Sequence, residues 1–352
     1  MIRACRVDAR RPRCSSTSVV PRSLATLLSA IGALAACAAL GLACGSFDDR
    51  SVSPSDDAAA ADAAPARDAA RADDAGDAPI VSGSCWLRPF GVPVNVPELS
   101  SEALELSARL SPDERTVFVA SNRVGGAGGV DLYTATRGTR SDAFGALTPL
   151  PFNTAADDTH PSLAFDGLTL YFATAQPTAD AGSTGSDIYF ATRGTSTLPF
   201  GSPTLMSAVS GPSDDSFPYA APSGGMYFAS NRDGDMTIYF AARAGVSFAT
   251  PVLVESLHEP GTISNLPVVS ADGLWIYFAS SRGGGGAEGE LDIWSSHRET
   301  VDAPFAPPVD VLELNTSSSD RPSWISNDGC RMYLTSTRPG GLGLLDVWLA
   351  ER

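Results

Sequence analysis

Apolar and polar residues alternate in short runs along the chain from about residue 85 to the C-terminus, and each run follows a tight turn. The clearest copy is Ser270–Arg282, in which Asp272-Gly273 precedes Leu-Trp-Ile-Tyr-Phe-Ala-Ser. An Asp-Gly turn before an alternating, aromatic-rich run predicts a turn that leads into a β-strand. Similar copies are found at Ser111–Arg123, Phe165–Thr174, Pro222–Arg232 and Ser326–Arg338. The pattern therefore predicts an all-β protein built from a repeated unit.

The turn residues give the length of the repeat. Asp113, Asp166, Asp272 and Asp328 mark equivalent turns and are 53, 106 and 56 residues apart, so the period is near 54 residues and the longest interval holds two repeats. A period of this length indicates an array of small structural units.

Each repeat is expected to contain four strands, of which the aromatic run is the second. The first strands lie just before the turns, at Ser107–Leu110, Pro161–Ala164, Pro218–Ala221, Pro267–Val269 and Pro322–Ile325. The third strands begin at Asp131, Asp187, Thr237, Asp292 and Asp346. The fourth strands cover Phe144–Leu150, Phe200–Met206, Phe248–Val254 and Phe305–Leu312. Four antiparallel strands per repeat indicate the blade of a β-propeller.

The two ends of the repeat region complete each other. The last repeat stops at Arg352 after its third strand, whereas Pro89–Val96 resembles a fourth strand and precedes the first repeat. An N-terminal outer strand in the last blade would close the ring and leave no unpaired edge. Five third strands then predict a five-bladed β-propeller over residues 85–352.

Charge and histidine spacing narrow the possible partners. The net charge is −16, and all 24 basic residues are arginines. This acidic balance argues against nucleic-acid binding, which requires clustered positive charge. His160, His258 and His297 lack the spacing of metal ligands, and the sequence has no phosphate loop or nucleophile elbow. We therefore expect neither a metal nor a cofactor.

The N-terminal segment has the features of an export signal. Residues 1–22 hold six arginines and one acid, and Ser23–Ala43 is an uninterrupted run of apolar and small residues. A positive region followed by an apolar region is typical of a signal peptide. The run ends in Leu34-Ala-Ala-Cys37 and Gly41-Leu-Ala-Cys44, which both resemble the bacterial lipobox. A signal peptide over 1–44 with lipidation at Cys44 or Cys37 is expected, and an uncleaved single-span anchor is the alternative.

Residues 45–84 form the next predicted segment. Most of it consists of Ala, Asp, Ser, Pro and Arg, with few large apolar side chains. Such a composition cannot bury enough surface to offset chain entropy, so a disordered acidic tether is expected. The folded body would then stand outside the cytoplasm as a lipid-anchored monomer, on the periplasmic or the surface side of a bacterial outer membrane.

The repeat consensus is similar to that of a known family. Ser-x-Asp-Gly-x-x-Leu/Ile-Tyr-Phe-Ala-Ser-x-Arg, followed by a glycine-rich loop and Asp-Ile-Tyr, resembles the WD-like repeat of TolB-type β-propellers of the bacterial envelope. The resemblance covers residues 85–352 and recurs five times. It implies the fold and leaves the activity open, because propellers host many unrelated activities. TolB-type proteins usually have six blades and a separate N-terminal domain, and this chain departs from that pattern.

One face of the predicted disc gathers charged residues. The repeats align Glu105, Asp158, Asp215, Ser264 and Asp320 before the first strands, and Arg123, Gln176, Arg232, Arg282 and Arg338 at the ends of the second strands. The favoured interpretation is that each arginine pairs with a carboxylate and ties the loops together. The alternative is a polar funnel that binds a cation, a peptide or a glycan. His160 adjoins this ring and is expected to be a surface histidine at the mouth of the channel.

Glycine-rich loops join the second and third strands. They are Val124–Val130, Pro177–Ser186, Gly283–Glu290 and Pro339–Leu345. Gly-Gly-x-Gly-x-x-Asp resembles a calcium-binding nonapeptide, but the sequence has no tandem nine-residue repeat. Hairpins with glycine at left-handed positions explain these loops.

Cys85 and Cys330 are expected to form a disulfide. Both lie in the predicted body, and exported proteins meet an oxidising compartment. Cys85 precedes the N-terminal outer strand, and Cys330 follows the Asp328-Gly329 turn of the last repeat. The topology places both positions on the same edge of the last blade, where a disulfide would staple the closure of the ring.

Two functional hypotheses follow. The first is a non-enzymatic envelope lipoprotein whose propeller face binds a protein or a cell-envelope glycan. The second is a glycan-active enzyme, because five-bladed propellers include glycosidases. Such enzymes need two carboxyl groups about 5–9.5 Å apart, and Asp158 and Asp215 are the first pair to consider. The absence of a catalytic motif in the sequence favours the first hypothesis.

Overall fold

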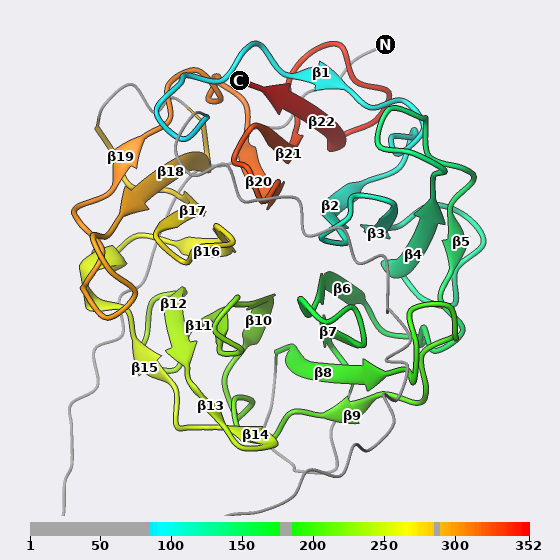
Figure 1. Cartoon of the computed structure of the whole chain (residues 1–352), viewed down its shortest axis with the longest axis horizontal. Coiled ribbons are helices and arrows are strands. Elements are labelled where there is room, and N and C mark those ends of the chain that lie inside the picture. The colour runs from blue at the N-terminus through cyan, green and yellow to red at the C-terminus, as the bar shows by residue number, and fades with distance from the viewer. Residues whose placement is uncertain (1–84, 177–184, 285–288) are drawn as a thin grey trace, which may run out of the picture. The chain divides into compact units, whose positions relative to one another are not determined.

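Five four-stranded antiparallel sheets surround a common centre (Figure 1). The computed structural model describes residues 85–176, 185–284 and 289–352. Within these ranges the single helix is the 3-10 helix η1 (Glu255–Leu257), and no helix is long and apolar enough to span a membrane. The predicted signal peptide, Cys37, Cys44 and the tether lie outside the described residues. The predicted five-bladed β-propeller is confirmed.

Each blade runs from an inner strand at the centre to an outer strand at the rim (Figure 1). Blade 1 contains β2 (Glu105–Leu110), β3 (Thr116–Ser121), β4 (Asp131–Thr136) and β5 (Thr148–Pro149). Blade 2 contains β6 (Asp158–Leu163), β7 (Thr169–Thr174), β8 (Asp187–Thr192) and β9 (Thr204–Leu205). Blade 3 contains β10 (Asp215–Ala220), β11 (Met226–Ser230), β12 (Thr237–Ala241) and β15 (Val252–Leu253). Blade 4 contains β16 (Ser264–Val269), β17 (Trp275–Ser280), β18 (Asp292–His297) and β19 (Val309–Asp310).

Blade 5 is built from both ends of the propeller. It contains β20 (Asp320–Ile325), β21 (Arg331–Ser336) and β22 (Asp346–Glu351), with β1 (Val94–Asn95) as its outer strand. β1 pairs antiparallel with β22, Val94 opposite Leu349. The Cys85–Cys330 disulfide joins the same two parts of the chain, with a Cα–Cα distance of 5.2 Å. Closure by the N-terminal strand and the disulfide are therefore both confirmed.

The inner strands begin two or three residues earlier than predicted. A proline in four of the five inner strands marked the expected start, because proline cannot donate to a ladder. In blades 2, 3 and 4 the strand continues through a β-bulge, and the residue before the proline has a positive φ: 51° at His160, 57° at Phe217 and 52° at Leu266. The β-bulge accommodates the proline, which has no backbone N–H to donate, so the inner strand begins before the proline. The acids that were expected just before the inner strands are therefore the first residues of those strands.

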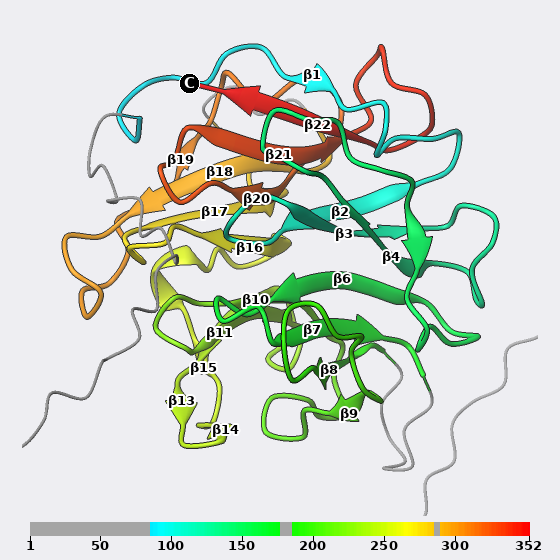
Figure 2. The same cartoon turned by 45° about the vertical axis from the view of Figure 1, so that its right-hand side comes forward.

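The outer strands are shorter than predicted. They pair over two residues, whereas the sequence indicated seven or eight. Prolines such as Pro149 and Pro251 lie in these segments and remove N–H donors from the ladder. Blade 3 also carries a hairpin that the sequence did not reveal, β13 (Arg243–Ala244) and β14 (Ser247–Phe248), which extends from the rim (Figure 2).

Candidate functional site

The acid ring is formed by Glu105, Asp158, Asp215 and Asp320, the first residues of four inner strands. Each of these side chains is fully buried. Each carboxylate accepts a hydrogen bond from the backbone N–H four residues earlier, for example 2.6 Å from Thr154 to Asp158 and 2.7 Å from Thr316 to Asp320. The ring therefore fixes the loops that enter the inner strands, on what is here called the acid face.

Three of the predicted arginines pair with the acid ring. The Nη2 atoms of Arg123, Arg232 and Arg338 lie 3.0, 2.5 and 2.6 Å from the carboxylates of Glu105, Asp215 and Asp320. Each of these Nη2 groups also donates to a main-chain carbonyl of the preceding loop, as Arg338 does to Leu314 at 2.6 Å. These contacts favour the structural interpretation of the ring, and its role as a ligand face stays a prediction.

Blades 2 and 4 depart from this arrangement. In blade 4 a serine replaces the acid, and Arg282 donates to Ser264 Oγ at 3.2 Å and to the Leu257 carbonyl at 2.6 Å. In blade 2 Gln176 replaces the arginine, and Asp158 forms no ion pair within the described residues. Burial raises the pKa of Asp158, and the nearby charge of Asp131 acts in the same direction.

The aspartates that begin the third strands organise the glycine-rich loops. Asp131 Oδ2 accepts the N–H of Gly128 at 3.1 Å, and Asp346 Oδ2 accepts those of Leu342 and Gly343. These bonds agree with the interpretation of the loops as hairpins. The described residues contain no group of three or more His, Cys, Asp or Glu side chains that could hold a metal ion.

His160 is not at the surface, so that prediction was wrong. Its side chain is 8% exposed and packs on the ring of Phe217 at a centroid distance of 4.1 Å. Burial, together with the nearby charges of Arg109 and Arg321, lowers the pKa of His160 to about 3. Its Nδ1 has no hydrogen-bond partner within the described residues. The bulge between Thr159 and Ser162 turns this residue inward, whereas the sequence interpretation began the strand at Pro161 and left His160 outside it.

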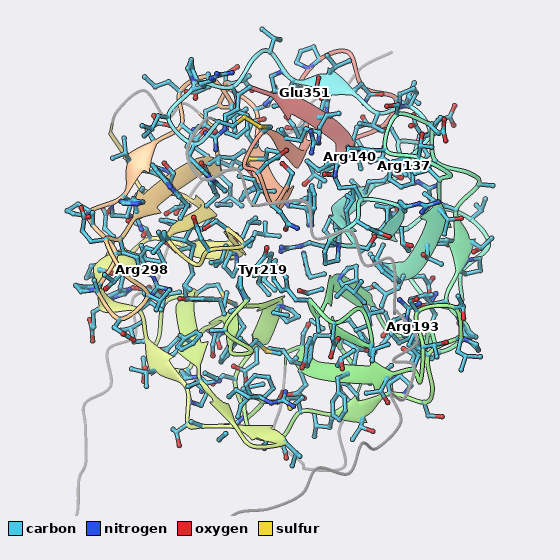
Figure 3. All side chains as sticks on the ribbon, viewed as in Figure 1. Arg137, Arg140, Arg193, Tyr219, Arg298 and Glu351 are labelled. Atoms are coloured by element: carbon cyan, nitrogen blue, oxygen red, sulfur yellow. A yellow bond between two sulfur atoms is a disulfide. The ribbon has the colours of Figure 1, made fainter. Side chains whose placement is uncertain are left out.

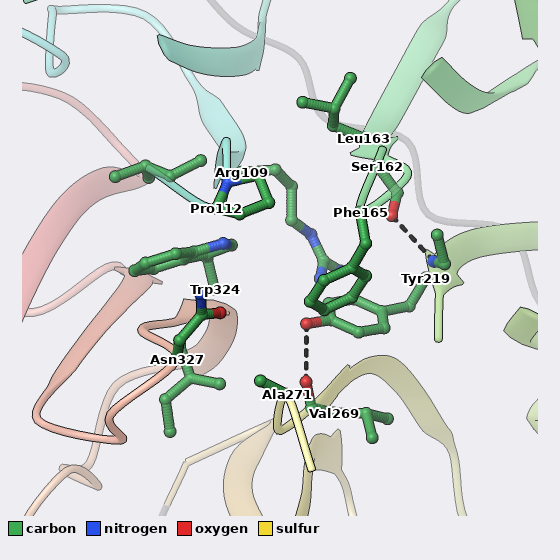
Figure 4. Close-up of a pocket in the computed structure, with 13 residues that line it drawn as sticks. Arg109, Pro112, Ser162, Leu163, Phe165, Tyr219, Val269, Ala271, Trp324 and Asn327 are labelled. Carbon is green, nitrogen blue, oxygen red and sulfur yellow. Dashed lines mark hydrogen bonds between the residues drawn. The ribbon is translucent and has the colours of Figure 1, made fainter. Parts of the chain in front are cut away.

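Arg109 is a residue of the channel that the sequence interpretation missed. It starts on β2 of blade 1, and its guanidinium donates to the Pro267 carbonyl of blade 4 at 3.3 and 3.4 Å. The guanidinium lies 4.8 Å from the ring centre of Tyr219, whose hydroxyl donates to the Val269 carbonyl at 2.7 Å (Figure 4). Burial lowers the pKa of Arg109 to about 10. The other four blades have Ser162, Tyr219, Val268 and Trp324 at the position of Arg109. A single charged residue at a position that is otherwise uncharged was the signal in the sequence that could have revealed Arg109.

A second set of arginines connects neighbouring blades at the rim. Each one follows a third strand by one or two residues and lies over the phenylalanine that begins the outer segment; the pairs are Arg137–Phe144, Arg193–Phe200, Arg243–Phe248, Arg298–Phe305 and Arg352–Phe90. Except in blade 3, Nε also donates to the carbonyl of the turn between the first two strands. Figure 3 shows Arg137, Arg193 and Arg298 spread around the rim, with Tyr219 at the centre.

The same arginines contact the preceding blade. Arg352 Nη2 donates to the hydroxyl of Tyr277 in blade 4 at 3.3 Å. Arg243, Arg298 and Arg137 stand beside Tyr171, Tyr227 and Tyr333 in the same way: burial raises the pKa of each tyrosine, and the neighbouring arginine acts in the opposite direction. We call each set of arginine, phenylalanine and tyrosine a rim latch. The fifth seam has Phe118 in place of the tyrosine, and this ring packs edge-on against Phe200 at 6.1 Å.

A groove lies at the seam between blades 3 and 4. It comprises two adjoining cavities of about 530 and 280 Å³, both lined by Tyr227, Phe240 and Arg298. The larger cavity also meets Asp272, Asp302 and the exposed Val301. Phe240 occupies the space above Gly225, where an added Cβ would lie 2.6 Å from the ring. Aromatic surfaces beside charged groups, in a volume within the usual range of ligand sites, make this groove a candidate binding site.

No protein-family model and no curated protein matches the chain. Many solved structures do, and three illustrate the range. A TolB-type protein of Agrobacterium tumefaciens is 13% identical, with 75% of this chain and 90% of that one covered and a TM-score of 0.42. The xyloglucan PUL protein GH43B of Bacteroides ovatus is 14% identical, with 73% and 53% covered and a TM-score of 0.47. A puromycin-hydrolyzing peptidase of Mycobacterium tuberculosis is 17% identical, with 66% and 33% covered and a TM-score of 0.38.

The chain spans about half of the Bacteroides protein and a third of the Mycobacterium protein. Similarity at this level concerns the fold alone. The identity of the fold rests on the sheet order of the chain itself, which is that of a five-bladed β-propeller closed by its N-terminal strand.

Proposed function

We propose that this chain is a non-enzymatic, lipid-anchored envelope protein whose propeller binds a protein or a glycan. The observation that carries the proposal is the groove between blades 3 and 4, which offers Tyr227, Phe240 and charged side chains to a ligand. Three of the four carboxylates of the acid ring, Glu105, Asp215 and Asp320, are paired with arginines within the protein. The groove is therefore a better candidate for ligand binding than the acid face.

The glycan-active alternative has less support. The first carboxylate pair considered for catalysis, Asp158 and Asp215, is fully buried, and Asp215 is paired with Arg232. The groove contains Asp272 and Asp302, but Asp272 accepts hydrogen bonds from the Ser270 hydroxyl and the Leu274 N–H in its own turn. A glycosidase needs both an acid and a nucleophile or base beside the substrate.

Co-sedimentation of the full chain in detergent with peptidoglycan sacculi and with a panel of insoluble polysaccharides tests glycan binding. Chemical cross-linking in intact cells, before and after removal of glycan, tests protein binding. Val301→Arg places a charged side chain in the groove at a position that is 52% exposed. We expect binding to fall at least about tenfold, as for the loss of a central contact.

Val309→Arg is the matched control, because Val309 is 64% exposed on β19 and does not line the groove. Equal loss of binding in both variants would contradict the groove as the site. Release of new reducing ends from any polysaccharide, abolished by Asp302→Asn or Asp158→Asn, would overturn the non-enzymatic proposal.

The anchor is proposed from the sequence alone. Mass spectrometry of the mature N-terminal peptide should show a diacylated cysteine at position 44 or 37, and the protein should partition into detergent. Cys44→Ser and Cys37→Ser distinguish the two positions. An intact Met1 on a cytosolic protein would exclude export, and a membrane-bound protein with Met1 intact would support the single-span alternative.

A further inference from the structure

We propose that the central channel of the propeller is a binding site for one small anion, of the size of a halide ion or a single carboxylate group. The proposal does not depend on the groove at the rim, because the two sites share only Val269 among their lining residues.

The first observation is that the guanidinium of Arg109 is buried without a counter-charge. The residue is 1% exposed, and no carboxylate of the described residues lies within ion-pair distance of it. Its Nη atoms share one backbone carbonyl, and its Nε has no hydrogen-bond partner. A buried cation of this kind is strongly disfavoured unless a negative group joins it. The arginines of the acid face, Arg123, Arg232, Arg282 and Arg338, all have a polar side-chain partner, and Arg109 of the channel has none.

The second observation is that further polar groups on the inner strands lack partners. His160 Nδ1, Ser107 Oγ and Ser323 Oγ are all buried, and none has a hydrogen-bond partner within the described residues. Arg321, at the second position of β20, donates its Nε–H to Ser319 Oγ at 3.1 Å and forms no ion pair among the residues described. The inner strands thus present positive charge and unused hydrogen-bonding groups, in a chain whose net charge is −16.

The third observation concerns the backbone. His160, Phe217 and Leu266 occupy the same position in three consecutive inner strands, and each has a positive φ although none is glycine. Non-glycine residues in this region are strained, and such strain is found preferentially at functional sites. Here the strain places the His160 and Phe217 rings against each other on neighbouring inner strands.

The space beside Arg109 sets the size of the ligand. The cavity that Arg109, Ser162, Tyr219 and Trp324 line is about 20 Å³, measured as the volume open to the centre of a water molecule (Figure 4). A volume of this size holds about one water-sized occupant. Gluconate and other bulky anions are too large for it, whereas a chloride ion or the carboxylate end of a ligand is of suitable size.

Thermal unfolding of the full chain in detergent tests the proposal, in sodium gluconate, sodium chloride and sodium formate at equal ionic strength. We expect chloride, formate or both to raise the melting temperature relative to gluconate, by about 5–10 °C at a hundredfold excess over the dissociation constant. A rise with chloride alone assigns the site to a free halide, and a rise with formate assigns it to carboxylate groups as well. Equal melting temperatures in all three salts would overturn the proposal.

Arg109→Gln should abolish the dependence on the anion, whereas Arg282→Gln, which alters an arginine of the acid face, should retain it. Since Arg109→Gln could fail to fold, the wild-type protein provides a second measurement. The ³⁵Cl NMR line should broaden on addition of the protein, and formate should narrow it again in the case in which formate also raises the melting temperature. No broadening, together with unchanged melting temperatures, would exclude the site, and Val301→Arg should change neither readout.

Discussion

The rim and the channel of this propeller use arginine in opposite ways. At the rim, Arg137, Arg193, Arg298 and Arg352 repeat one arrangement, with Nε on a turn carbonyl and the guanidinium over a phenylalanine. In the channel, Arg109 has no equivalent in the other blades, and its Nε has no partner among the described residues.

This difference between the recurring rim arginines and the single channel arginine distinguishes contacts that stabilise the repeat from residues that belong to one site. A contact that recurs at each seam holds neighbouring blades together, so the repeat itself accounts for it. An unmatched charge in the interior lowers stability, and nothing in the repeat accounts for it. Singular residues of the channel are therefore better candidates for binding than the recurring charges of the acid face.

The largest loss of stability is expected in blade 5, where the N-terminal and C-terminal parts of the propeller together form the rim latch. Deleting Trp86–Val96 removes β1 and Phe90, and it exposes the edge of β22. We expect an aggregating product, because an open edge and uncovered apolar side chains favour association. Size-exclusion chromatography and the solubility of the deletion variant measure this effect.

Deletion of eleven residues from the tether, 60–70, is the matched control and should leave a soluble protein. A soluble Trp86–Val96 deletion that unfolds cooperatively would contradict closure by the N-terminal strand.

The second effect concerns the disulfide at the same closure. Cys85 and Cys330 are 245 residues apart in sequence. Replacing both by serine should lower the free energy of unfolding by about 4–5 kcal/mol, less any strain, because the bond restricts a very long loop of the unfolded chain. Urea unfolding of the wild type with and without reductant measures this difference. Identical midpoints, or two free thiols in the native protein, would refute the bond.

The third effect contrasts two arginines of the acid face. Arg338→Met leaves the buried carboxylate of Asp320 without its charged partner, and we expect a loss of about 3–5 kcal/mol. Arg282→Met leaves a serine hydroxyl and a carbonyl, since the nearest carboxylate, Glu259, is half exposed and 3.8 Å away. Its expected loss is about 1–2 kcal/mol. Equal losses in urea unfolding would show that the ion pairs of the acid ring contribute nothing beyond their hydrogen bonds.

The features that repeat could be predicted from the sequence, because each position of the repeat occurs five times in the chain. The five third strands and the displaced outer strand gave the blade count, and Cys85 and Cys330 were the cysteines left in the body. The rim arginines were visible as well, but a repeated residue does not reveal its partner. Arg352 contacts Phe90 and Tyr277, which lie far from it in sequence.

The channel could not be predicted in this way. Its residues come from the same strand position of different blades, and their distances depend on how the ring closes. Arg109 bonds to a carbonyl of blade 4, which does not neighbour blade 1. The sequence interpretation placed His160 outside the sheet because Pro161 follows it, and the backbone shows that a left-handed residue keeps the strand intact.

The fourth effect compares the rim and the channel directly. Arg298→Met removes a bond to the Gly273 carbonyl at 2.8 Å and the contact with Phe305, so stability should fall by about 1–3 kcal/mol. Arg109→Met in gluconate should instead raise stability by about 1–2 kcal/mol, because an apolar side chain of similar length replaces an unpaired buried charge. Chemical denaturation of both variants measures whether each substitution lowers or raises the free energy of unfolding. A loss of stability in both would show that Arg109 serves the fold.

The smallest effect is expected at Asp158, the carboxylate of the acid ring that has no arginine partner in the part of the chain that the structure describes. Asp158→Asn keeps an oxygen that can accept the Thr154 N–H, and it removes a charge that burial and Asp131 disfavour. Because the pKa of Asp158 in the folded protein is raised above its ordinary value, the folded state holds the proton more tightly than the unfolded chain. The contribution of the wild-type carboxyl to stability is therefore greatest below the ordinary pKa and is lost as the pH rises through the raised pKa.

The Asp158→Asn variant should match the stability of the wild type in acid and exceed it at neutral pH by up to about 1 kcal/mol, the size of one net polar contact. Asp320→Asn should be less stable than the wild type at neutral pH, because Arg338 loses its carboxylate. If Asp158→Asn were less stable than the wild type at pH 7 by as much as Asp320→Asn, the carboxylate of Asp158 would have a cationic partner in the folded protein.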